Sequence, residues 1–294
     1  MNLFTSNSRV LIIYGLSFYL FQLTIGWIFA WLTLLSNHNL SNFQRAKIEP
    51  FVLAGNSRVF RGFDIHNSES LREVVSNWSS PGQNFDSTLT MLKSSNLTQN
   101  HKIFYEITGL GNDTKFQTSL LPFSILNERI ADLLSSSDQL EPIHRIFIAS
   151  RFNSSTFLDI LQKIFIVPSH QSYVLDGTLN LDTEALERAK SFYLSAVANI
   201  EKLNEFINFC SKKNLNCIFF IAPIHPSLLD DSSIKKIIDI TEKSAVGAGY
   251  EFFNWSGLVT SPQEFYDFQH LNSEGAKKLT TQLTLQIISK NGVF

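Results

Sequence analysis

The 294-residue sequence lacks several features that mark common functional classes. Two cysteines, Cys210 and Cys217, are too few for a disulfide-rich scaffold or a four-cysteine zinc site. Lys and Arg number 24 against 26 Asp and Glu, without a basic run, which argues against nucleic-acid binding. No GxxxxGKS/T loop, GxGxxG turn or HExxH helix is present. We therefore expect no cofactor, no metal and no nucleic-acid partner.

Charged residues are absent from one long N-terminal stretch. From Val10 to Leu35, 26 residues pass without an Asp, Glu, Lys or Arg. About 20 apolar residues suffice to span a membrane, so residues 10–35 are expected to form a transmembrane anchor behind a short N-terminus of residues 1–9. The alternative is a cleaved signal peptide, whose apolar region is typically about 7–15 residues and ends in small residues. The apolar run of residues 10–35 is longer than that and is not followed by a small-residue cleavage site.

Positive charges flank the expected anchor on both sides. Arg9 lies directly before it, whereas Arg45 and Lys47 follow at some distance. Charge next to a span keeps that side cytoplasmic, which predicts a single-pass topology with the main domain outside the cytoplasm. Arg45 and Lys47, on the other side of the span, favour the opposite orientation. An exported position would permit a Cys210–Cys217 disulfide, and two buried thiols are the alternative.

After a polar linker at residues 36–50, residues 51–294 read as an α/β domain. Short apolar runs alternate with longer amphipathic stretches, which predicts a mostly parallel sheet flanked by helices. The expected strands are 51–54, 72–76, 102–108, 217–223 and 250–253. The expected helices are 182–213, 232–246 and 272–289, and residues 120–181 fit the alternation poorly enough to be an insertion.

Polar turns follow the first three expected strands. Ser57, in Gly55-Asn56-Ser57-Arg58, has the strand-end position of a nucleophilic serine, although Ser and Asn also cap helices. Gly82 follows a proline, and Asn112 lies in Gly-Leu-Gly-Asn-Asp. The backbone N–H of Gly82 and the side-chain amide of Asn112 could bind an oxyanion. Both sequences are also ordinary turn formers.

A fourth motif, Asp267-Phe268-Gln269-His270, precedes the C-terminal helix. The carboxylate can accept a proton from one imidazole nitrogen and leave the other nitrogen to act as a base. Three further residues are candidates to line a substrate site, namely Asn84, Arg58 and His225. Asn84 is also the substitute oxyanion donor if Asn112 faces away. A surface role is the alternative for Arg58.

Together these motifs resemble the SGNH hydrolases, also called the GDSL family. Ser57 matches the nucleophile, Gly82 and Asn112 match the oxyanion blocks, and Asp267 with His270 matches the last block, in the order that the family has. The resemblance covers residues 51–290 and implies a flavodoxin-like three-layer fold with a Ser-His-Asp triad. Two positions depart from the pattern: Asn56 replaces the usual Asp, and GLGND stands where G-x-N-D is usual.

The anchor and the insertion narrow this resemblance to the membrane-anchored branch of the superfamily. That branch includes proteins related to the D-alanylation accessory protein of teichoic acids and to the acetyltransferase-like proteins of alginate export. The resemblance implies a serine esterase or O-acyltransferase that acts on acyl esters of extracytoplasmic glycans, beside a membrane-bound O-acyltransferase. The alternative is a non-catalytic scaffold that binds a glycan or such an acyltransferase.

Overall fold

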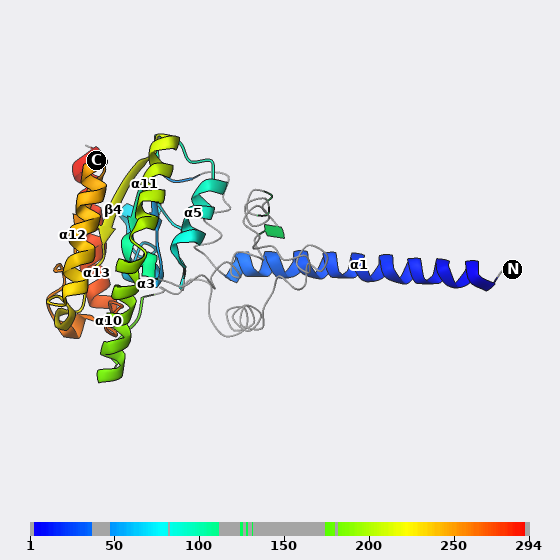
Figure 1. Cartoon of the computed structure of the whole chain (residues 1–294), viewed down its shortest axis with the longest axis horizontal. Helices are drawn as coiled ribbons and strands as arrows, with labels where there is room; N and C mark the ends of the chain where they lie inside the picture. Colours follow the sequence, from blue (N-terminus) through cyan, green and yellow to red (C-terminus); the bar gives the residue numbers. More distant parts are fainter. Residues whose placement is uncertain are drawn as a thin grey trace. The chain divides into compact units, whose positions relative to one another are not determined.

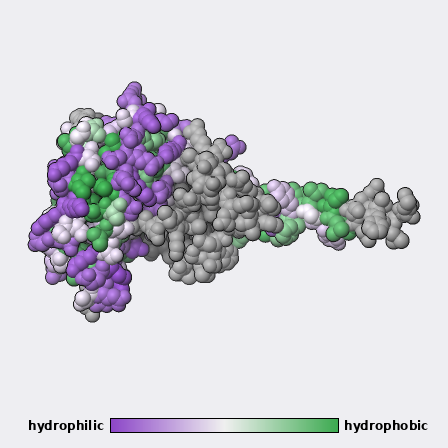
Figure 2. Space-filling view, viewed as in Figure 1, coloured by the Kyte–Doolittle hydropathy of each residue, from purple (hydrophilic) through white to green (hydrophobic). Residues whose placement is uncertain are grey.

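The computed structural model describes residues 3–36, 48–81, 83–111, 124, 125, 128, 131, 174–179 and 182–291 (Figure 1). Helix α1 (Leu3–Ser36) and the α/β sheet belong to two separate compact units. Within α1, Val10–Leu32 has a mean hydropathy of 1.6 and is long and apolar enough to cross a membrane or to serve as a signal sequence. Figure 2 shows hydrophobic residues exposed along this helix. The orientation predicted for the anchor stays a prediction.

The sheet has five strands, all parallel, as predicted for this class of fold. They are β1 (Phe51–Ala54), β2 (Val75–Asn77), β3 (Lys102–Glu106), β4 (Asn216–Ile221) and β5 (Glu251–Asn254), in the spatial order β2-β1-β3-β4-β5. This order is that of flavodoxin-like sheets, whose ligands bind where the carboxyl ends of neighbouring strands diverge, between β1 and β3.

Helices cover both faces of the sheet (Figure 1). They are α3 (Ser57–Gly62), α4 (Glu69–Arg72), α5 (Phe85–Ser94), α10 (Thr183–Ala198), α11 (Glu201–Lys213), α12 (Ser232–Gly247) and α13 (Ser273–Asn291). Short 3-10 helices η1 (Ile107–Gly111), η5 (Pro226–Leu228) and η6 (Pro262–Glu264) lie between them. The expected insertion at 120–181 falls mostly outside the described residues and stays a prediction.

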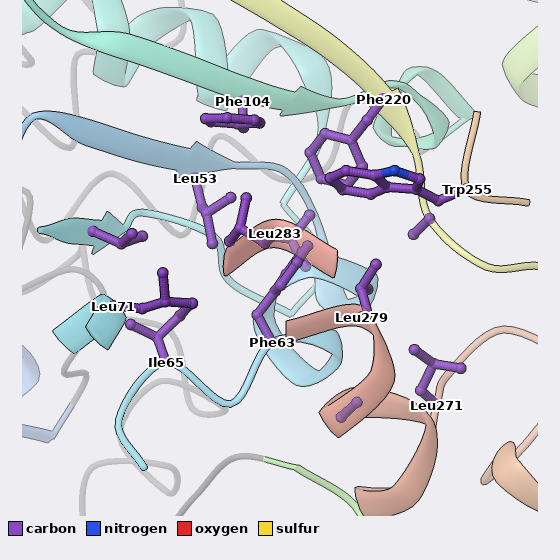
Figure 3. Packing of buried hydrophobic residues seen from close by; sticks show 14 of the residues in the cluster. Leu53, Phe63, Ile65, Leu71, Phe104, Phe220, Trp255, Leu271, Leu279 and Leu283 are labelled. Carbon is purple, nitrogen blue, oxygen red and sulfur yellow. The ribbon is translucent and has the colours of Figure 1, made fainter. Parts of the chain in front are cut away.

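Alternation of side chains along the strands builds two cores. On one face, Leu53, Phe104 and Phe220 pack with Leu279 and Leu283 of α13 (Figure 3). On the other face, the ring of Tyr105 stacks on Phe206 of α11 with centroids 4.3 Å apart, and Phe85 and Phe219 complete this group. Both faces of the central strands are therefore buried, which explains why these strands read as continuous apolar runs.

Two element predictions were wrong in detail. The single helix expected over 182–213 is divided into α10 and α11 at Asn199–Ile200. The amide of Asn199 donates to the Ser195 carbonyl oxygen at 2.9 Å, a bond of the kind by which asparagine disfavours a helix interior. The weak strand expected over 72–76 starts at Val75, because residues 69–72 form α4.

Cys210 and Cys217 form a disulfide between α11 and β4. Both residues are buried, at 0% and 1% exposure. The α11 helix ends at Lys213, and Asn214 adopts a left-handed conformation with φ 52° before the chain enters β4. The bridge thus connects the two elements on either side of this tight turn.

Reduction of this disulfide should lower the melting temperature of the protein. The bridge restricts the unfolded chain, and its removal should cost about 2 kcal/mol, or roughly 4–8 °C for a domain of this size. Circular dichroism melting of the detergent-solubilised chain, with and without a phosphine reductant, measures the difference. The variant Cys210→Ala/Cys217→Ala is the control and should not respond to reductant. Equal wild-type midpoints in both conditions would contradict the prediction.

Candidate active site

Ser57 lies at the first turn of α3, directly after β1. Gly55 makes the turn with φ +156°, and a Cβ added there would lie 2.6 Å from Val59 Cγ2 and 3.1 Å from Glu106 Cβ. Only glycine therefore allows the chain to pass this close to its neighbours. The turn leaves Ser57 half-buried at the carboxyl edge of the sheet.

Asn56, at the position where the SGNH resemblance predicts an aspartate, is the N-cap of α3. Its Oδ1 accepts a hydrogen bond from the Arg58 backbone N–H at 2.9 Å. The backbone carbonyl of Asn56 accepts from the N–H groups of Val59 and Phe60. Among the described residues no acceptor bonds the Ser57 N–H. An asparagine at this position therefore caps the turn that carries Ser57.

The sequence Asp267–His270 forms a tight turn that orients its own carboxylate. Asp267 Oδ1 accepts hydrogen bonds from the backbone N–H groups of Gln269 at 2.7 Å and His270 at 2.8 Å. The Tyr266 N–H donates to the His270 carbonyl oxygen at 2.9 Å and closes the turn. The spacing D-x-x-H thus lets one carboxylate bind both the backbone and the side chain of the same histidine.

The structure brings Ser57, His270 and Asp267 into one hydrogen-bonded chain. His270 Nδ1 lies 2.8 Å from Asp267 Oδ2, and His270 Nε2 lies 2.8 Å from Ser57 Oγ. Because a carboxylate only accepts, Nδ1 carries the proton of the neutral ring, and Nε2 accepts from the Ser57 hydroxyl. This assignment leaves Nε2 as the base that serine activation requires.

Asp267 is ionised more readily than an ordinary aspartate. Burial alone would raise the pKa of this carboxyl, but the hydrogen bond and charge of His270 and the two backbone N–H groups lower it below 3.8 overall. Asp267 therefore stays a carboxylate at neutral pH and holds the His270 ring in one tautomer.

Packing of α13 on α3 brings the two halves of the site together across 213 residues of sequence. A Cβ added at Gly62 of α3 would lie 3.3 Å from Leu279 Cδ2 of α13, so the helices are in close contact there. The Asp64 N–H donates to Thr280 Oγ1 at 2.9 Å just beyond α3. These contacts set the distance between the turn of Ser57 and the loop that precedes α13.

Asn272 anchors the loop of the histidine, a role that sequence reasoning did not assign. Its Nδ2 donates to the carbonyl oxygens of Gln263 at 2.6 Å and Gly177 at 3.2 Å, and its Oδ1 accepts from Gly275 N–H at 3.3 Å. At Gly275, an added Cβ would clash with the Glu264 carbonyl oxygen. The sequence Leu-Asn-Ser-Glu-Gly after His270 could have indicated the role of Asn272, because it places an asparagine directly before a helix.

Two predicted oxyanion residues, Gly82 and Asn112, lie outside the described residues, and their assignment stays a prediction. Asn84, the predicted substitute, is buried as the N-cap of α5. Its Oδ1 accepts from the Ser87 N–H at 3.0 Å and from the Ser87 hydroxyl at 2.6 Å. The side-chain oxygen of Asn84 is thus bonded to the first turn of α5, and the oxyanion role of this residue stays a prediction.

Arg58 occupies a structural position instead of the predicted substrate-lining one. The residue is 3% exposed, and its guanidinium faces Glu106 of β3, with 3.4 Å between Nη1 and Oε1. The N-terminal turn of α3 directs this side chain under the sheet edge, away from solvent. Sequence reasoning also missed Glu106. The signal was a lone carboxylate inside an apolar strand, since buried carboxylates are nearly always paired.

His225 packs beside the Asp267–His270 turn, and its predicted role in lining the site stays a prediction. Its ring packs edge-on against Phe265 at 5.1 Å and Phe268 at 4.9 Å, one of which adjoins Asp267 in sequence. Nδ1 accepts from the Ser227 N–H at 3.3 Å and lies 2.8 Å from Ser227 Oγ. Burial lowers the pKa of His225 despite the opposing charge of Asp267, so the ring is neutral with its proton on Nε2.

A cavity among the described residues lies apart from this site. This cavity of about 380 Å³, lined by Phe51, Leu71, Lys102 and Ile287 among others, lies at the amino ends of β1 and β3. It contains none of the predicted site residues. No three His, Cys, Asp or Glu side chains come together as metal ligands in the part of the chain that the structure describes.

Comparison with known proteins adds little to this geometry. No protein-family profile and no curated protein sequence matches the chain. Among solved structures, it is weakly similar to a Bacteroides fragilis NCTC 9343 protein described as a "putative acylhydrolase", with a TM-score of 0.40 and 12% identity over 84% of this chain and 89% of that chain. Likeness at this level carries no argument about function, which rests on the site itself.

Replacement of Gly55 by alanine should destabilise the protein. The added Cβ would overlap Val59 Cγ2, and relief of such overpacking typically costs about 1–3 kcal/mol. Thermal melting of Gly55→Ala measures the loss. Gly257→Ala is the matched control, because a Cβ there meets nothing within 4 Å. Equal midpoints for the two variants would contradict the prediction.

Acid should remove the stability that Asp267 contributes. Because folding lowers the pKa of this carboxyl below 3.8, its contribution is complete above that value and is lost as the pH falls through the lower folded pKa. The loss of melting temperature caused by Asp267→Asn should be larger at about pH 7 than at about pH 3, where the wild-type carboxyl also loses its charge. An equal difference at pH 3 and pH 7 would show that the carboxylate charge contributes nothing.

Proposed function

We propose that this chain is a membrane-anchored SGNH-type serine esterase or O-acyltransferase that uses Ser57, His270 and Asp267 as a triad. The observation that carries the proposal is the continuous hydrogen-bonded chain from Asp267 through His270 to Ser57 Oγ. Three further features support it: the nucleophile lies on a glycine turn after β1, the base lies before the last helix, and both lie at the carboxyl edge of a flavodoxin-like sheet.

In the proposed reaction, His270 Nε2 takes the proton of the Ser57 hydroxyl as Oγ bonds to an ester carbonyl carbon. The tetrahedral intermediate then collapses. The bond to the leaving alcohol breaks, His270 returns the proton to that oxygen, and an acyl-Ser57 ester remains. The Asp267 carboxylate stays ionised and stabilises the imidazolium that forms during each transfer.

The oxyanion would be bound by backbone and side-chain donors at the same edge. The Ser57 N–H, which has no acceptor among the described residues, is the first donor. The resemblance to SGNH hydrolases adds the Gly82 N–H and the Asn112 side chain. Such preorganised donors stabilise charge that develops only in the transition state. A second cycle through His270 transfers the acyl group to water in a hydrolase or to a sugar hydroxyl in a transferase.

The proposed location is the extracytoplasmic side of a membrane. Two observations support it: Val10–Leu32 suits a membrane span, and the Cys210–Cys217 disulfide is typical of oxidising compartments. We infer acyl esters of extracytoplasmic glycans as the substrate class, with a membrane-bound O-acyltransferase as partner. That inference rests on the SGNH resemblance together with this location.

Ser57→Ala should abolish the activity. Without Oγ no acyl-enzyme forms, and kcat for p-nitrophenyl acetate should fall by about 10³-fold or more, with loss of labelling by a fluorophosphonate probe. Ser227→Ala is the matched control. Ser227 Oγ also lies 2.8 Å from a histidine nitrogen, in His225, but no carboxylate in the described residues bonds the other nitrogen of that ring. The control should label at the wild-type rate.

Two outcomes would overturn the proposal. Labelling that survives Ser57→Ala would exclude Ser57 as the nucleophile. A folded wild-type chain that neither labels nor turns over the ester, yet binds an acylated glycan, would instead establish the scaffold alternative. In that case Ser57, Asp267 and His270 would be dispensable for binding.

A further inference from the structure

A buried ion pair lies directly beneath the proposed nucleophile. Arg58 is 3% exposed and Glu106 is 0% exposed, and their facing atoms are 3.4 Å apart. Removing two charges from water is costly, and replacing a buried pair by apolar residues is often neutral or stabilising. Fold stability alone therefore does not account for this pair.

Glu106 is held by groups from two other segments. Its Oε2 accepts from the Thr108 N–H at 3.1 Å and the Thr108 hydroxyl at 2.6 Å. Its Oε1 accepts from the Ala222 N–H at 3.3 Å, just after β4. The carboxylate thereby links the carboxyl ends of β3 and β4.

Arg58 extends this link to the turn after β1. Its Nη2 donates to the carbonyl oxygens of Ala222 at 2.9 Å and Pro223 at 2.5 Å. Its Nη1 donates to Thr108 Oγ1 at 3.3 Å. The ring of Tyr193 lies 5.4 Å from the guanidinium carbon and covers it. The buried guanidinium of Arg58 thus connects the start of α3, after β1, to the carboxyl ends of β3 and β4.

Both neighbours of Ser57 donate to the same hydroxyl. Asn56 Nδ2 lies 3.4 Å and Arg58 Nη1 lies 3.3 Å from Thr108 Oγ1, whose own proton goes to Glu106. The residues before and after the nucleophile are therefore anchored at one oxygen atom of η1. This arrangement adds to the helix cap a second constraint on the residues that flank Ser57.

We propose that Thr108, with the Arg58–Glu106 pair, is a positioning element that holds Ser57 Oγ within hydrogen-bond reach of His270. None of these three side chains touches the reacting atoms. The inference rests on the proposed function and adds residues to it. Misplacement of a catalytic group by about 1 Å can cost 10²-fold in rate, so loss of the shared hydroxyl should be visible in the chemistry at Ser57.

Thr108→Val tests the proposal on the full-length, detergent-solubilised chain. The variant keeps the shape of the side chain but removes the acceptor shared by Asn56 and Arg58. We expect the second-order rate of fluorophosphonate labelling to fall about 10–100-fold, with kcat for p-nitrophenyl acetate lowered and KM unchanged. Thr108→Ser, which restores the hydroxyl, should recover most of the rate.

A second variant separates position from stability. Arg58→Met/Glu106→Leu removes both buried charges and should melt near the wild-type temperature, because no unpaired charge remains. It should still label slowly, since the side-chain hydrogen bonds that Arg58 and Glu106 make to Thr108, Ala222 and Pro223 are lost. Wild-type labelling rates in Thr108→Val, or in this double variant, would overturn the inference while leaving the proposed function intact. A wild-type chain that does not label would refute the proposed function and this inference with it.

Discussion

The close packing of α13 against α3 is the contact on which the candidate site depends. The nucleophile turn is built at the start of the α/β domain and the Asp267–His270 turn near its end, and neither can act without the other. Contact at Gly62 and Leu279, within the core that also holds Leu283, sets their distance. Because protein interiors are close-packed, a change of one methyl group at this contact would move the base relative to the hydroxyl.

Hydrogen bonds within each half of the site orient its side chains. Asp267 binds the backbone of its own turn, so its carboxylate is oriented whether or not Ser57 is near. On the other side, Asn56 caps α3 and also reaches Thr108. Local hydrogen bonds therefore orient Asp267 and cap α3, whereas the bond of Asn56 to Thr108 and the pairing of Ser57 with His270 span 52 and 213 residues and depend on tertiary packing. Preorganisation of this kind is what electrostatic catalysis requires.

The buried polar groups beneath the site distinguish it from the rest of the core. Most buried side chains of the described residues are aliphatic or aromatic, as the stacking of Tyr105 on Phe206 illustrates. Under Ser57 the same sheet contains a charge pair and several bonded carbonyl groups. Buried polar networks destabilise a fold unless every member is hydrogen-bonded. Natural proteins tend to keep such destabilising groups at functional sites.

Local pattern alone determined much of this protein. The apolar run of α1, the parallel α/β alternation, the strand at Phe51–Ala54 and the D-x-x-H turn all depend on residues near one another in sequence. Such patterns could not show where long-range partners lie. Arg58 read as a surface or substrate residue because Glu106 and the Ala222 carbonyl are 48 and 164 positions away. The helix break at Asn199 escaped prediction because one side-chain bond outweighed a continuous helical pattern.

The meeting of Ser57 and His270 was inferred from a resemblance, and only the tertiary structure decided it. A distance of 2.8 Å across 213 residues depends on the summed packing of the sheet, α3 and α13, which no local pattern encodes.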